Sequence, residues 1–306
     1  MVITEFMDQR AIDVLRAEFD VFSDPGLGTD RDHLLPLLVD AEALIVRNET
    51  TVDSELLSAA PGLKVVARLG VGVDNIDLEA CNKRGVEVAP ARGANAVAVA
   101  EYVIGALLFL TRGVFGDSSR VIAGEWPRLE LRGGELAGKQ LGLIGYGAIA
   151  REVARTAIAL GMDAVAYDPY LKRDDPGWDT VIPVELPELL AGSAAVSVHV
   201  PLSQETHHLL GSEAVAMMSP DALVINTSRG GVVDESAVIS ALSNGRLGGA
   251  ALDVFETEPL DSKSGARFSG VPNLILTPHV AGITTESEAR IGDMTVATVR
   301  RHLGPT

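Results

Sequence analysis

Three polar segments in the second half of the chain each follow a short apolar run, and they carry groups suited to proton transfer. The segments are Asn226–Gly231, Asp253–Pro259 and Thr277–His279. A histidine can act as a general acid or base because free imidazole titrates near ~6.5. A neighbouring carboxylate can orient it, and an arginine presents a planar fork to an anion. The carboxyl ends of parallel strands meet at one sheet edge, so we expect these segments to form one site.

A glycine turn precedes these segments and indicates what a cofactor would be. The run Leu141-Gly-Leu-Ile-Gly145-Tyr-Gly147-Ala148-Ile149-Ala150 is an apolar strand, a glycine turn and the start of a helix. Asp168 ends the next apolar run. Gly145 would make the tight turn, Gly147 would let a pyrophosphate reach the backbone, and the acid would bind a ribose hydroxyl. This arrangement predicts a dinucleotide-binding βαβ unit, the alternative being an ordinary strand–helix turn that uses glycine for close packing.

Strands alternate with helices along the whole chain, which predicts parallel sheets covered by helices. We expect a first block with strands at 2–5, 43–47, 63–69 and 86–89, and helices such as 9–19 and 52–59. A long helical segment should run from Asn95 towards Trp126. A second block should contain six strands, at 141–144, 164–167, 194–200, 222–227, 249–254 and 274–276. The last helix, 286–302, has no following strand in its own block, so we expect it to return to the first domain.

Composition limits the classes of partner. The chain has 306 residues, 47% of them hydrophobic, and a formal net charge of −17, which argues against nucleic acid and anionic membranes as partners. An anionic substrate would need local positive groups. The single cysteine, Cys81, excludes an intrachain disulfide and suits a reducing compartment. The N-terminal run has no basic region or long apolar stretch, so we expect no secretory signal and a cytoplasmic location.

Motifs spread over most of the chain resemble one enzyme family. They are Arg68-Leu-Gly70-Val71-Gly72-Val-Asp74-Asn75-Ile-Asp77, Ala100-Glu101, the glycine turn, His199-Val-Pro201, Asn226–Asp234, Asp253–Pro259 and Pro278-His279. Together they are similar to the NAD-dependent D-isomer-specific 2-hydroxyacid dehydrogenases, and within that family they most resemble the motifs of the phosphoglycerate dehydrogenase branch. The resemblance implies two doubly wound α/β domains. One is a flavodoxin-like substrate-binding domain (1–94 plus 285–306), and the other is a Rossmann NAD-binding domain (95–284).

The resemblance also implies roles for individual residues. The family's catalytic arginine, its acid partner and its histidine fall on Arg229, Glu258 and His279. His279 would exchange the proton of the substrate hydroxyl during hydride transfer to NAD, Glu258 would orient the imidazole, and Arg229 would bind the carboxylate and polarise the carbonyl oxygen. The implied cofactor contacts are Gly145, Gly147, Ala148, Ile149, Asp168, His199, Pro201, Thr206, Thr227, Arg229, Asp253 and His279.

Two departures from the family concern the cofactor turn. Relatives commonly carry arginine where this chain has Ala148, and glycine where it has Ala150. Loss of that arginine removes a charge-assisted contact to the pyrophosphate, so weaker cofactor binding is expected. Neither change affects the reaction chemistry.

Substrate contacts are expected from the first domain. The backbone amides of Gly70, Val71 and Gly72 can hold the carboxylate, and Arg47 can reach the distal end of the substrate, with Arg92 as a second candidate. If both arginines converge, the substrate carries a second anion, and the candidates are 3-phosphoglycerate and 3-sulfolactate. The run Ile3-Thr-Glu-Phe-Met-Asp8 is similar to the sulfolactate dehydrogenases of the family.

Several alternatives stay open. A glyoxylate or hydroxypyruvate reductase acting on a plain 2-keto acid would use the same fold, and some relatives of this fold are NAD-binding transcriptional corepressors. The adjacent His207 and His208 lack further ligands in sequence, so no metal site is expected. The apolar run Tyr102–Leu110 suits a dimer contact, as in relatives, and predicts a homodimer.

Overall fold

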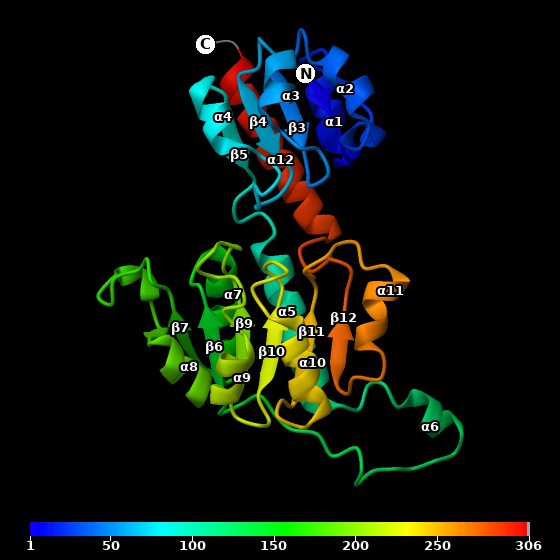
Figure 1. The fold of residues 1–306 in the computed structure, drawn as a ribbon, viewed down its shortest axis with the longest axis vertical. Helices are drawn as coiled ribbons and strands as arrows, with labels where there is room; N and C mark the ends of the chain where they lie inside the picture. The colour runs from blue at the N-terminus through cyan, green and yellow to red at the C-terminus, as the bar shows by residue number, and fades with distance from the viewer. Residues whose placement is uncertain (305–306) are drawn as a thin grey trace. The chain divides into compact units, whose positions relative to one another are not determined.

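The computed structural model describes residues 1–304, and the chain divides into two units. The first unit is Met1–Asn95 together with the final segment from Ile283, and the second is Ala96–Gly282. Each unit is a parallel sheet with helices on its faces (Figure 1).

The first unit has five strands in the order β2-β1-β3-β4-β5, all parallel. This is the flavodoxin-like order. The strands are β1 (Val2–Ile3), β2 (Phe22–Ser23), β3 (Ala43–Val46), β4 (Val65–Arg68) and β5 (Glu87–Pro90). The helices are α1 (Gln9–Arg16), α2 (Arg31–Leu37), α3 (Ser54–Ala59), α4 (Leu78–Lys83) and α12 (Thr285–Leu303), with a 3₁₀ turn, η1 (Pro25–Gly28).

Two local signals explain why this unit folds as it does. Its central strand β3 is wholly apolar and buried, as a strand covered on both faces must be. Aspartate caps begin α1, α2, α3 and α4, each carboxylate accepting a backbone N–H of the first turn. On one face of the sheet, α12 packs against α1 and β4, where Ile291, Val296 and Val299 are buried with Ile3 and Ile45.

The second unit has seven parallel strands in the order β12-β11-β10-β9-β6-β7-β8. Counted from β6, this is the Rossmann order 3-2-1-4-5-6 with one more strand at the far edge. The strands are β6 (Gln140–Ile144), β7 (Asp163–Tyr167), β8 (Ile182–Pro183), β9 (Ala195–Val198), β10 (Leu223–Asn226), β11 (Gly249–Leu252) and β12 (Leu274–Leu276). The helices are α5 (Ala96–Arg112), α6 (Ser118–Ile122), α7 (Ala148–Ala159), α8 (Leu186–Gly192), α9 (Ser212–Met217), α10 (Glu235–Ser243) and α11 (Ser262–Gly265), with 3₁₀ turns η2 (Pro176–Trp178) and η3 (Ala266–Phe268).

The predicted fold class, two doubly wound parallel sheets, is confirmed, but three element predictions need correction. Each sheet contains one strand that the sequence did not reveal, β2 in the first and β8 in the second. Both have two residues at a sheet edge, too short to show a hydrophobic pattern. The long helix does not run on to Trp126. It ends at Arg112, where Gly113 adopts φ +64°.

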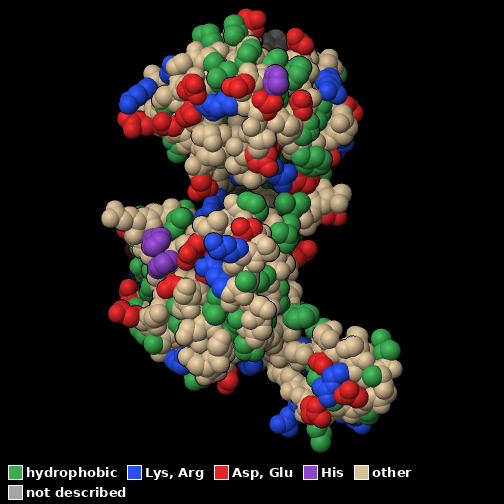
Figure 2. Space-filling model, turned by 45° about the vertical axis from the view of Figure 1, so that its right-hand side comes forward, with side chains coloured by type: hydrophobic (Ala, Val, Ile, Leu, Met, Phe, Trp, Pro, Cys, Tyr) green, Lys and Arg blue, Asp and Glu red, His purple; other side chains and the backbone are tan. Residues whose placement is uncertain are grey.

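The segment after α5 differs from the rest of the second unit. It carries α6 and extends away from the sheet of that unit (Figure 1). Several large apolar side chains on it are exposed, namely Phe115, Val121, Ile122, Trp126 and Leu129. Elsewhere, acidic side chains are spread among lysine and arginine over the face shown in Figure 2. No helix within residues 1–304 is long and apolar enough to cross a membrane.

Candidate active site

The glycine turn joins β6 to α7 and leaves space beside the backbone. Gly145 has φ +85°, and a Cβ there would lie 2.8 Å from the carbonyl oxygen of His199, so only glycine fits. A Cβ on Gly147 would meet no atom within 4 Å. Helix α7 begins at Ala148, beside Ile149, with no side-chain cap on its first turn. Its free amides therefore face an open approach, which fits a pyrophosphate.

Asp168 follows β7 and closes this turn. One carboxylate oxygen accepts the N–H of Tyr146 at 2.9 Å, and the other accepts the N–H of Tyr170 at 3.0 Å. The two bonds hold the carboxylate beside the glycine turn. Each oxygen keeps a lone pair with which to accept a ribose hydroxyl.

Two other predicted cofactor residues show distinct chemistry. The Thr227 hydroxyl oxygen is buried and has no hydrogen-bond partner among residues 1–304, as expected of a group that awaits a ligand. His199 shares a hydrogen bond of 2.9 Å with the Ser197 hydroxyl. Burial lowers the pKa of His199 to about 3, although part of the residue reaches solvent, so its ring is neutral at neutral pH.

Thr206 has a structural bond that sequence reasoning did not foresee. Its hydroxyl donates to the carbonyl oxygen of Pro201 at 2.6 Å and accepts the N–H of Ser203 at 2.7 Å. These bonds close the loop that follows β9. Pro201 is exposed on that loop.

The side chains of His279 and Glu258 form a hydrogen-bonded pair. The His279 Nδ1 and the Glu258 Oε2 atoms are 2.7 Å apart. Because a carboxylate accepts, Nδ1 carries the hydrogen, which leaves Nε2 of the neutral ring as the base. The His279 side chain is 51% exposed, so the ring is open to a reactant.

Glu258 is held in its charged form. Burial raises its pKa, but the hydrogen bonds from His279 and from the Phe255 N–H at 2.9 Å, with the nearby Arg229 charge, outweigh burial and lower the pKa overall. A carboxylate that is ionised at neutral pH can stabilise an imidazolium beside it. Arg229, Glu258 and His279 all lie in the second unit, at the carboxyl ends of β10, β11 and β12.

The turn after β10 fixes the backbone around Arg229. The buried Asn226 side chain accepts the N–H of Ser228 at 3.1 Å and donates to the carbonyl oxygen of Arg229 at 2.9 Å. A Cβ on Gly230 would lie 1.8 Å from the carbonyl oxygen of Phe255, so the chain passes there only as glycine. The arginine backbone is thereby held against the loop that carries Glu258.

Asp253 organises the loop that bears His279. Its carboxylate accepts the Thr277 hydroxyl at 2.5 Å and the N–H groups of Val280 and Ala281 at 2.9 and 2.8 Å. Its carbonyl oxygen accepts the N–H of His279, whose φ of +55° is left-handed. The hydroxyls of Tyr102 and Thr277 are 2.6 Å apart, and since Thr277 donates to Asp253, Tyr102 donates to Thr277.

In the first unit, the loop after β4 presents free backbone donors. The N–H groups of Val71 and Gly72 have no acceptor among residues 1–304. Gly70 has φ +143°, and a Cβ there would lie 1.7 Å from Nη1 of Arg68. Arg68 donates to the carbonyl oxygen of Leu69 at 3.2 Å and so supports the loop from beneath. The donors fit a carboxylate.

Arg47 is engaged rather than free. Its guanidinium makes a two-point ion pair with Glu288 on α12, at 2.7 and 3.1 Å. Arg92 lies exposed in the turn after β5. Its backbone N–H donates to the carbonyl oxygen of Pro90 at 2.8 Å, while its guanidinium has no hydrogen bond to residues 1–304. Sequence reasoning did not find Glu288, because one acid in a charged amphipathic helix gives no signal of its partner.

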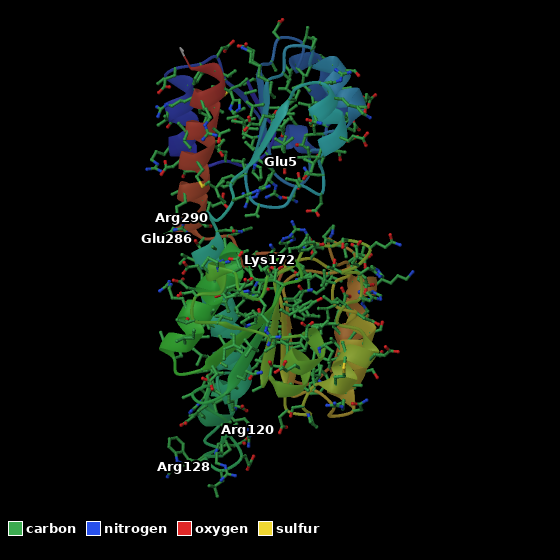
Figure 3. The ribbon with its side chains drawn as sticks, turned by 90° about the vertical axis from the view of Figure 1, so that its left-hand side faces the viewer. Glu5, Arg120, Arg128, Lys172, Glu286 and Arg290 are labelled. Atoms are coloured by element: carbon green, nitrogen blue, oxygen red, sulfur yellow. The ribbon has the colours of Figure 1, made fainter. Side chains whose placement is uncertain are left out.

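Sequence reasoning also missed Glu5 and Tyr102. Glu5 is 4% exposed, and its carboxylate accepts the backbone N–H groups of residues 47–50 at 2.7 to 3.0 Å. Figure 3 labels Glu5 in the first unit. Burial raises its pKa, but these N–H groups outweigh burial and lower it. The sequence signal for Glu5 was an acidic residue within a predicted apolar strand, whereas no sequence feature singled out Tyr102.

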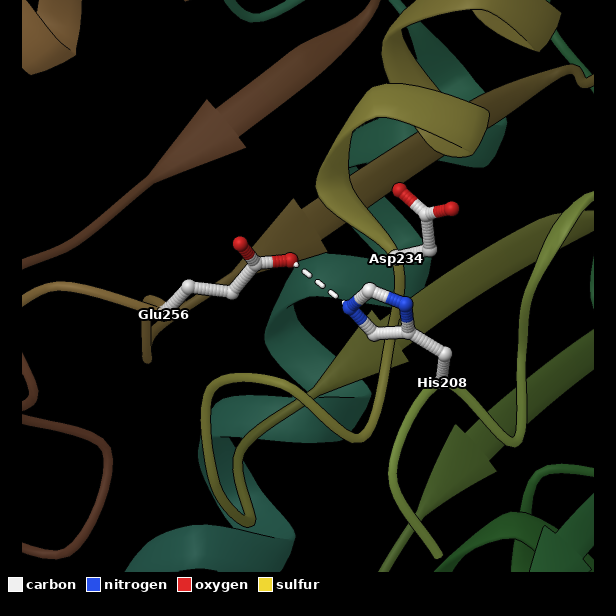
Figure 4. A group of neighbouring side chains, drawn as sticks. All are labelled: His208, Asp234 and Glu256. Atoms are coloured by element: carbon white, nitrogen blue, oxygen red, sulfur yellow. Dashed lines mark hydrogen bonds and ion pairs between the residues drawn. The ribbon is translucent and has the colours of Figure 1, made fainter.

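His208 does have acidic neighbours in space. Its Nε2 lies 3.1 Å from Oε1 of Glu256, and Asp234 lies close by (Figure 4). Asp234 already accepts the N–H of Ala237 as the cap of α10. The three residues come from three loops at the carboxyl edge of the sheet, and the bond between His208 and Glu256 joins two of these loops. The His207 ring stacks on that of His208, with ring centroids 4.0 Å apart.

Comparisons with known proteins agree with this geometry. Residues 104–281 match the family described as "D-isomer specific 2-hydroxyacid dehydrogenase, NAD binding domain". The chain is 51% identical to the (S)-sulfolactate dehydrogenase of Chromohalobacter salexigens, over 99% of this chain and 98% of that protein. It is 35% identical to the D-3-phosphoglycerate dehydrogenase of Methanocaldococcus jannaschii, over 99% of this chain but only 57% of that protein.

A solved structure extends the comparison to a bound cofactor. The D-lactate dehydrogenase of Aquifex aeolicus, complexed with NAD and lactic acid, superposes with a TM-score of 0.83 and is 30% identical, covering 98% of this chain and 94% of that one. The protein is thus an NAD-dependent oxidoreductase and belongs to the D-isomer-specific 2-hydroxyacid dehydrogenase family.

Proposed function

We propose that the protein transfers a hydride between C2 of a D-2-hydroxy acid and NAD, with His279, Glu258 and Arg229 as its catalytic residues. The observation that carries this assignment is the bond of 2.7 Å between His279 and Glu258 at the carboxyl edge of the NAD-binding sheet. NAD, when bound, accepts or supplies the hydride. Everything else in the reaction is the movement of one proton and the binding of a carboxylate.

The residues divide these tasks by their chemistry. Nε2 of His279 takes the hydroxyl proton as the C2–H bond breaks, and it returns the proton in the reverse direction. Glu258 stays ionised, orients the ring and stabilises the imidazolium. Arg229 binds the carboxylate with its planar fork and polarises the C2 oxygen. We propose that the amides of Val71 and Gly72 in the first unit bind the same carboxylate. The predicted contact of Gly70 needs correction, because its N–H already donates to the carbonyl oxygen of Arg68 at 2.8 Å.

The residues at the glycine turn fit NAD. Gly145, Gly147, Ala148 and Ile149 would hold the pyrophosphate, and Asp168 would accept the ribose hydroxyls. The buried Thr227 hydroxyl, which lacks a partner among residues 1–304, together with His199, Pro201, Thr206 and Asp253, would line the rest of the cofactor path.

We propose 3-sulfolactate as the substrate, with 3-phosphoglycerate as the alternative of the same charge type. The support is the similarity to a sulfolactate dehydrogenase over nearly the whole of both chains. Arg47 is the proposed ligand of the second anion, and Arg92 is the secondary candidate. The ion pair of Arg47 with Glu288 is the one observation that favours a plain 2-keto acid instead, because it neutralises the arginine.

A substrate panel separates these possibilities. Reduction of 2-keto acids by NADH would be followed for side chains ending in methyl, hydroxymethyl, phosphonooxymethyl and sulfomethyl groups. We expect the highest kcat/KM with the sulfomethyl acid. Equal values for the methyl and sulfomethyl acids would favour the plain 2-keto acid, and no turnover of any acid would contradict the proposal, leaving an NAD-binding regulator as the alternative.

We further propose a cytoplasmic homodimer. Its support is the run of partly exposed apolar residues on α5, with Leu108 and Phe109 40% and 42% exposed, followed by the exposed apolar segment after it. The location is supported by Cys81, a free buried thiol that suits a reducing compartment.

A further inference from the structure

The pair formed by Arg47 and Glu288 stands apart from the other ion pairs of the first unit. The two side chains are only 17% and 13% exposed, whereas Arg10 and Asp293, paired at the same distance of 2.7 Å, are 62% and 67% exposed. A shielded pair is screened less by salt and holds its geometry better than an exposed one. The guanidinium of Arg47 therefore rests in a well-defined contact with a carboxylate.

Glu288 is not needed to shape the loop that carries Arg47. That loop is held through its backbone, by the four N–H groups that bond to Glu5 and by Asn75, whose amide donates to the carbonyl oxygen of Thr50 at 2.6 Å. Glu288 itself bonds only the side chain of Arg47 among side chains of residues 1–304. Its contact thus acts on the charge of the arginine, not on the course of the chain.

The carboxylates beside Arg47 disfavour the binding of an anion from solution. Two carboxylates, Glu5 and Glu288, contact this one arginine, the first at its backbone N–H and the second at its guanidinium. The oxygens of Glu5 accept the backbone N–H groups of the loop, so Glu5 cannot move away without breaking these bonds. Glu288 lies in the first turns of α12, where a helix N-terminus favours negative charge. It occupies the same two donors that a phosphate or sulfonate would use.

We propose that Glu288 is a specificity-determining residue that competes with the distal anion of the substrate for the guanidinium of Arg47. The inference rests on the proposed function, in which Arg47 binds that anion. A sulfonate or phosphonooxy group must displace the carboxylate of Glu288 from Arg47. This exchange breaks the ionic hydrogen bonds of one anion and forms those of the other, and no covalent bond changes. A substrate without a second anion leaves the pair intact. Glu288 therefore weakens the preference for doubly anionic substrates.

The test compares three variants as holoenzymes with NADH. Glu288→Gln removes the competing charge but keeps a hydrogen-bond acceptor. The matched control is Asp293→Asn, on the same helix, which removes the charge from an exposed pair of equal length. Arg47→Ala reports whether the arginine binds substrate at all. The probes are the sulfomethyl 2-keto acid and pyruvate, measured by KM and by the rise in Tm that each ligand produces.

We expect Glu288→Gln to lower KM for the sulfomethyl acid by about 3- to 10-fold and to leave KM for pyruvate unchanged, the size expected from losing one partly shielded ionic competitor. The ligand-induced rise in Tm should also exceed that of the wild type, because the anion of the ligand then supplies the charge partner that the substitution removed. Asp293→Asn should change neither quantity.

The failures can be told apart. If Arg47→Ala leaves KM for the sulfomethyl acid unchanged, Arg47 does not bind the distal anion, and that part of the proposed function fails with the inference. If Arg47→Ala raises this KM but Glu288→Gln raises it or leaves it unchanged, only the competition is refuted. Should Glu288→Gln fold poorly, Glu288→Asp keeps the charge with a shorter reach and should lower KM by a smaller factor; an unchanged or raised KM would refute the inference.

Discussion

The pair of His279 and Glu258 shows how the state of one residue depends on its neighbour. Glu258 has a pKa below its ordinary value, because hydrogen bonds from His279 and Phe255 outweigh burial, so it is charged at neutral pH. Its carboxylate lies 2.7 Å from Nδ1 of His279. In the proposed oxidation of a hydroxy acid, His279 accepts the hydroxyl proton, and the charge of Glu258 stabilises the imidazolium that forms.

Glu258→Gln should therefore lower kcat/KM for oxidation by at least about tenfold, because the imidazolium formed in the reaction loses its charge partner. His199 provides the comparison. Its pKa of about 3 keeps it neutral across the working range, so His199→Gln should leave the shape of the pH profile unchanged whatever it does to the rate. A changed profile in His199→Gln would contradict this neutral state, and a wild-type kcat/KM in Glu258→Gln would contradict the role of Glu258.

Asp168 is the residue proposed to set the choice between NAD and NADP. It is fixed by two backbone N–H groups, and no arginine follows it directly in Asp168-Pro169-Tyr170 to receive a 2′-phosphate. We expect wild-type kcat/KM to favour NADH over NADPH. Asp168→Ser should reduce this preference by roughly tenfold or more. The substitution weakens the hydrogen bond to the ribose hydroxyl of NADH and removes the repulsion between the carboxylate and the 2′-phosphate of NADPH. Equal wild-type efficiency with both cofactors would contradict the role.

At the scale of elements, helix α5 reaches the catalytic loop through Tyr102. The chain of donors runs from Tyr102 to Thr277 to Asp253. Asp253 also accepts the backbone N–H groups of the left-handed His279 and of the two residues that follow it. Burial raises the pKa of Tyr102 above its ordinary value, so its hydroxyl remains a donor at neutral pH. Tyr102 is thus a positioning residue for the loop.

Tyr102→Phe keeps the ring and removes only the hydroxyl. We expect kcat to fall by about 3- to 10-fold while KM for the hydroxy acid changes little, and stability to fall by about 1 kcal/mol, the usual net size of one hydrogen bond. Thr295→Val, which removes a buried hydroxyl bond of 2.9 Å in the first unit, is the control and should lower Tm without changing kcat. Equal kcat in Tyr102→Phe and the wild type would remove the positioning role.

The element scale also shows what the sequence could predict. The sequence predicts the long apolar strands, the glycine turn and the polar segments at the strand ends, because buried strands and tight turns constrain residue type locally. The two edge strands β2 and β8 were not, since two residues cannot show a period. The bonds of Arg47 to Glu288 and of Tyr102 to Thr277 join residues 241 and 175 positions apart, and no local pattern encodes such contacts.

At the scale of the whole molecule, the exposed apolar segment after α5 bears on assembly. Ile122 and Leu129 are 86% and 89% exposed, more than a lone globular chain usually leaves in one segment. If they pack against a second copy, Ile122→Asp with Leu129→Asp should turn a dimer into a monomer of half the mass in light scattering. Val39→Asp, at a residue 55% exposed in the first unit, should leave the mass unchanged. A wild-type protein that is monomeric at micromolar concentration would contradict the homodimer.

We propose that one proton relay, built from His279 and Glu258, serves hydride transfer at C2 of a D-2-hydroxy acid. The most direct measurement is the rate of NAD reduction by the two enantiomers of 3-sulfolactate, for the wild type and for His279→Ala at equal cofactor saturation. The wild type should oxidise one enantiomer, and His279→Ala should lower its turnover by roughly 10²–10⁴. Near-normal turnover in His279→Ala, or oxidation of both enantiomers at equal rates, would contradict it.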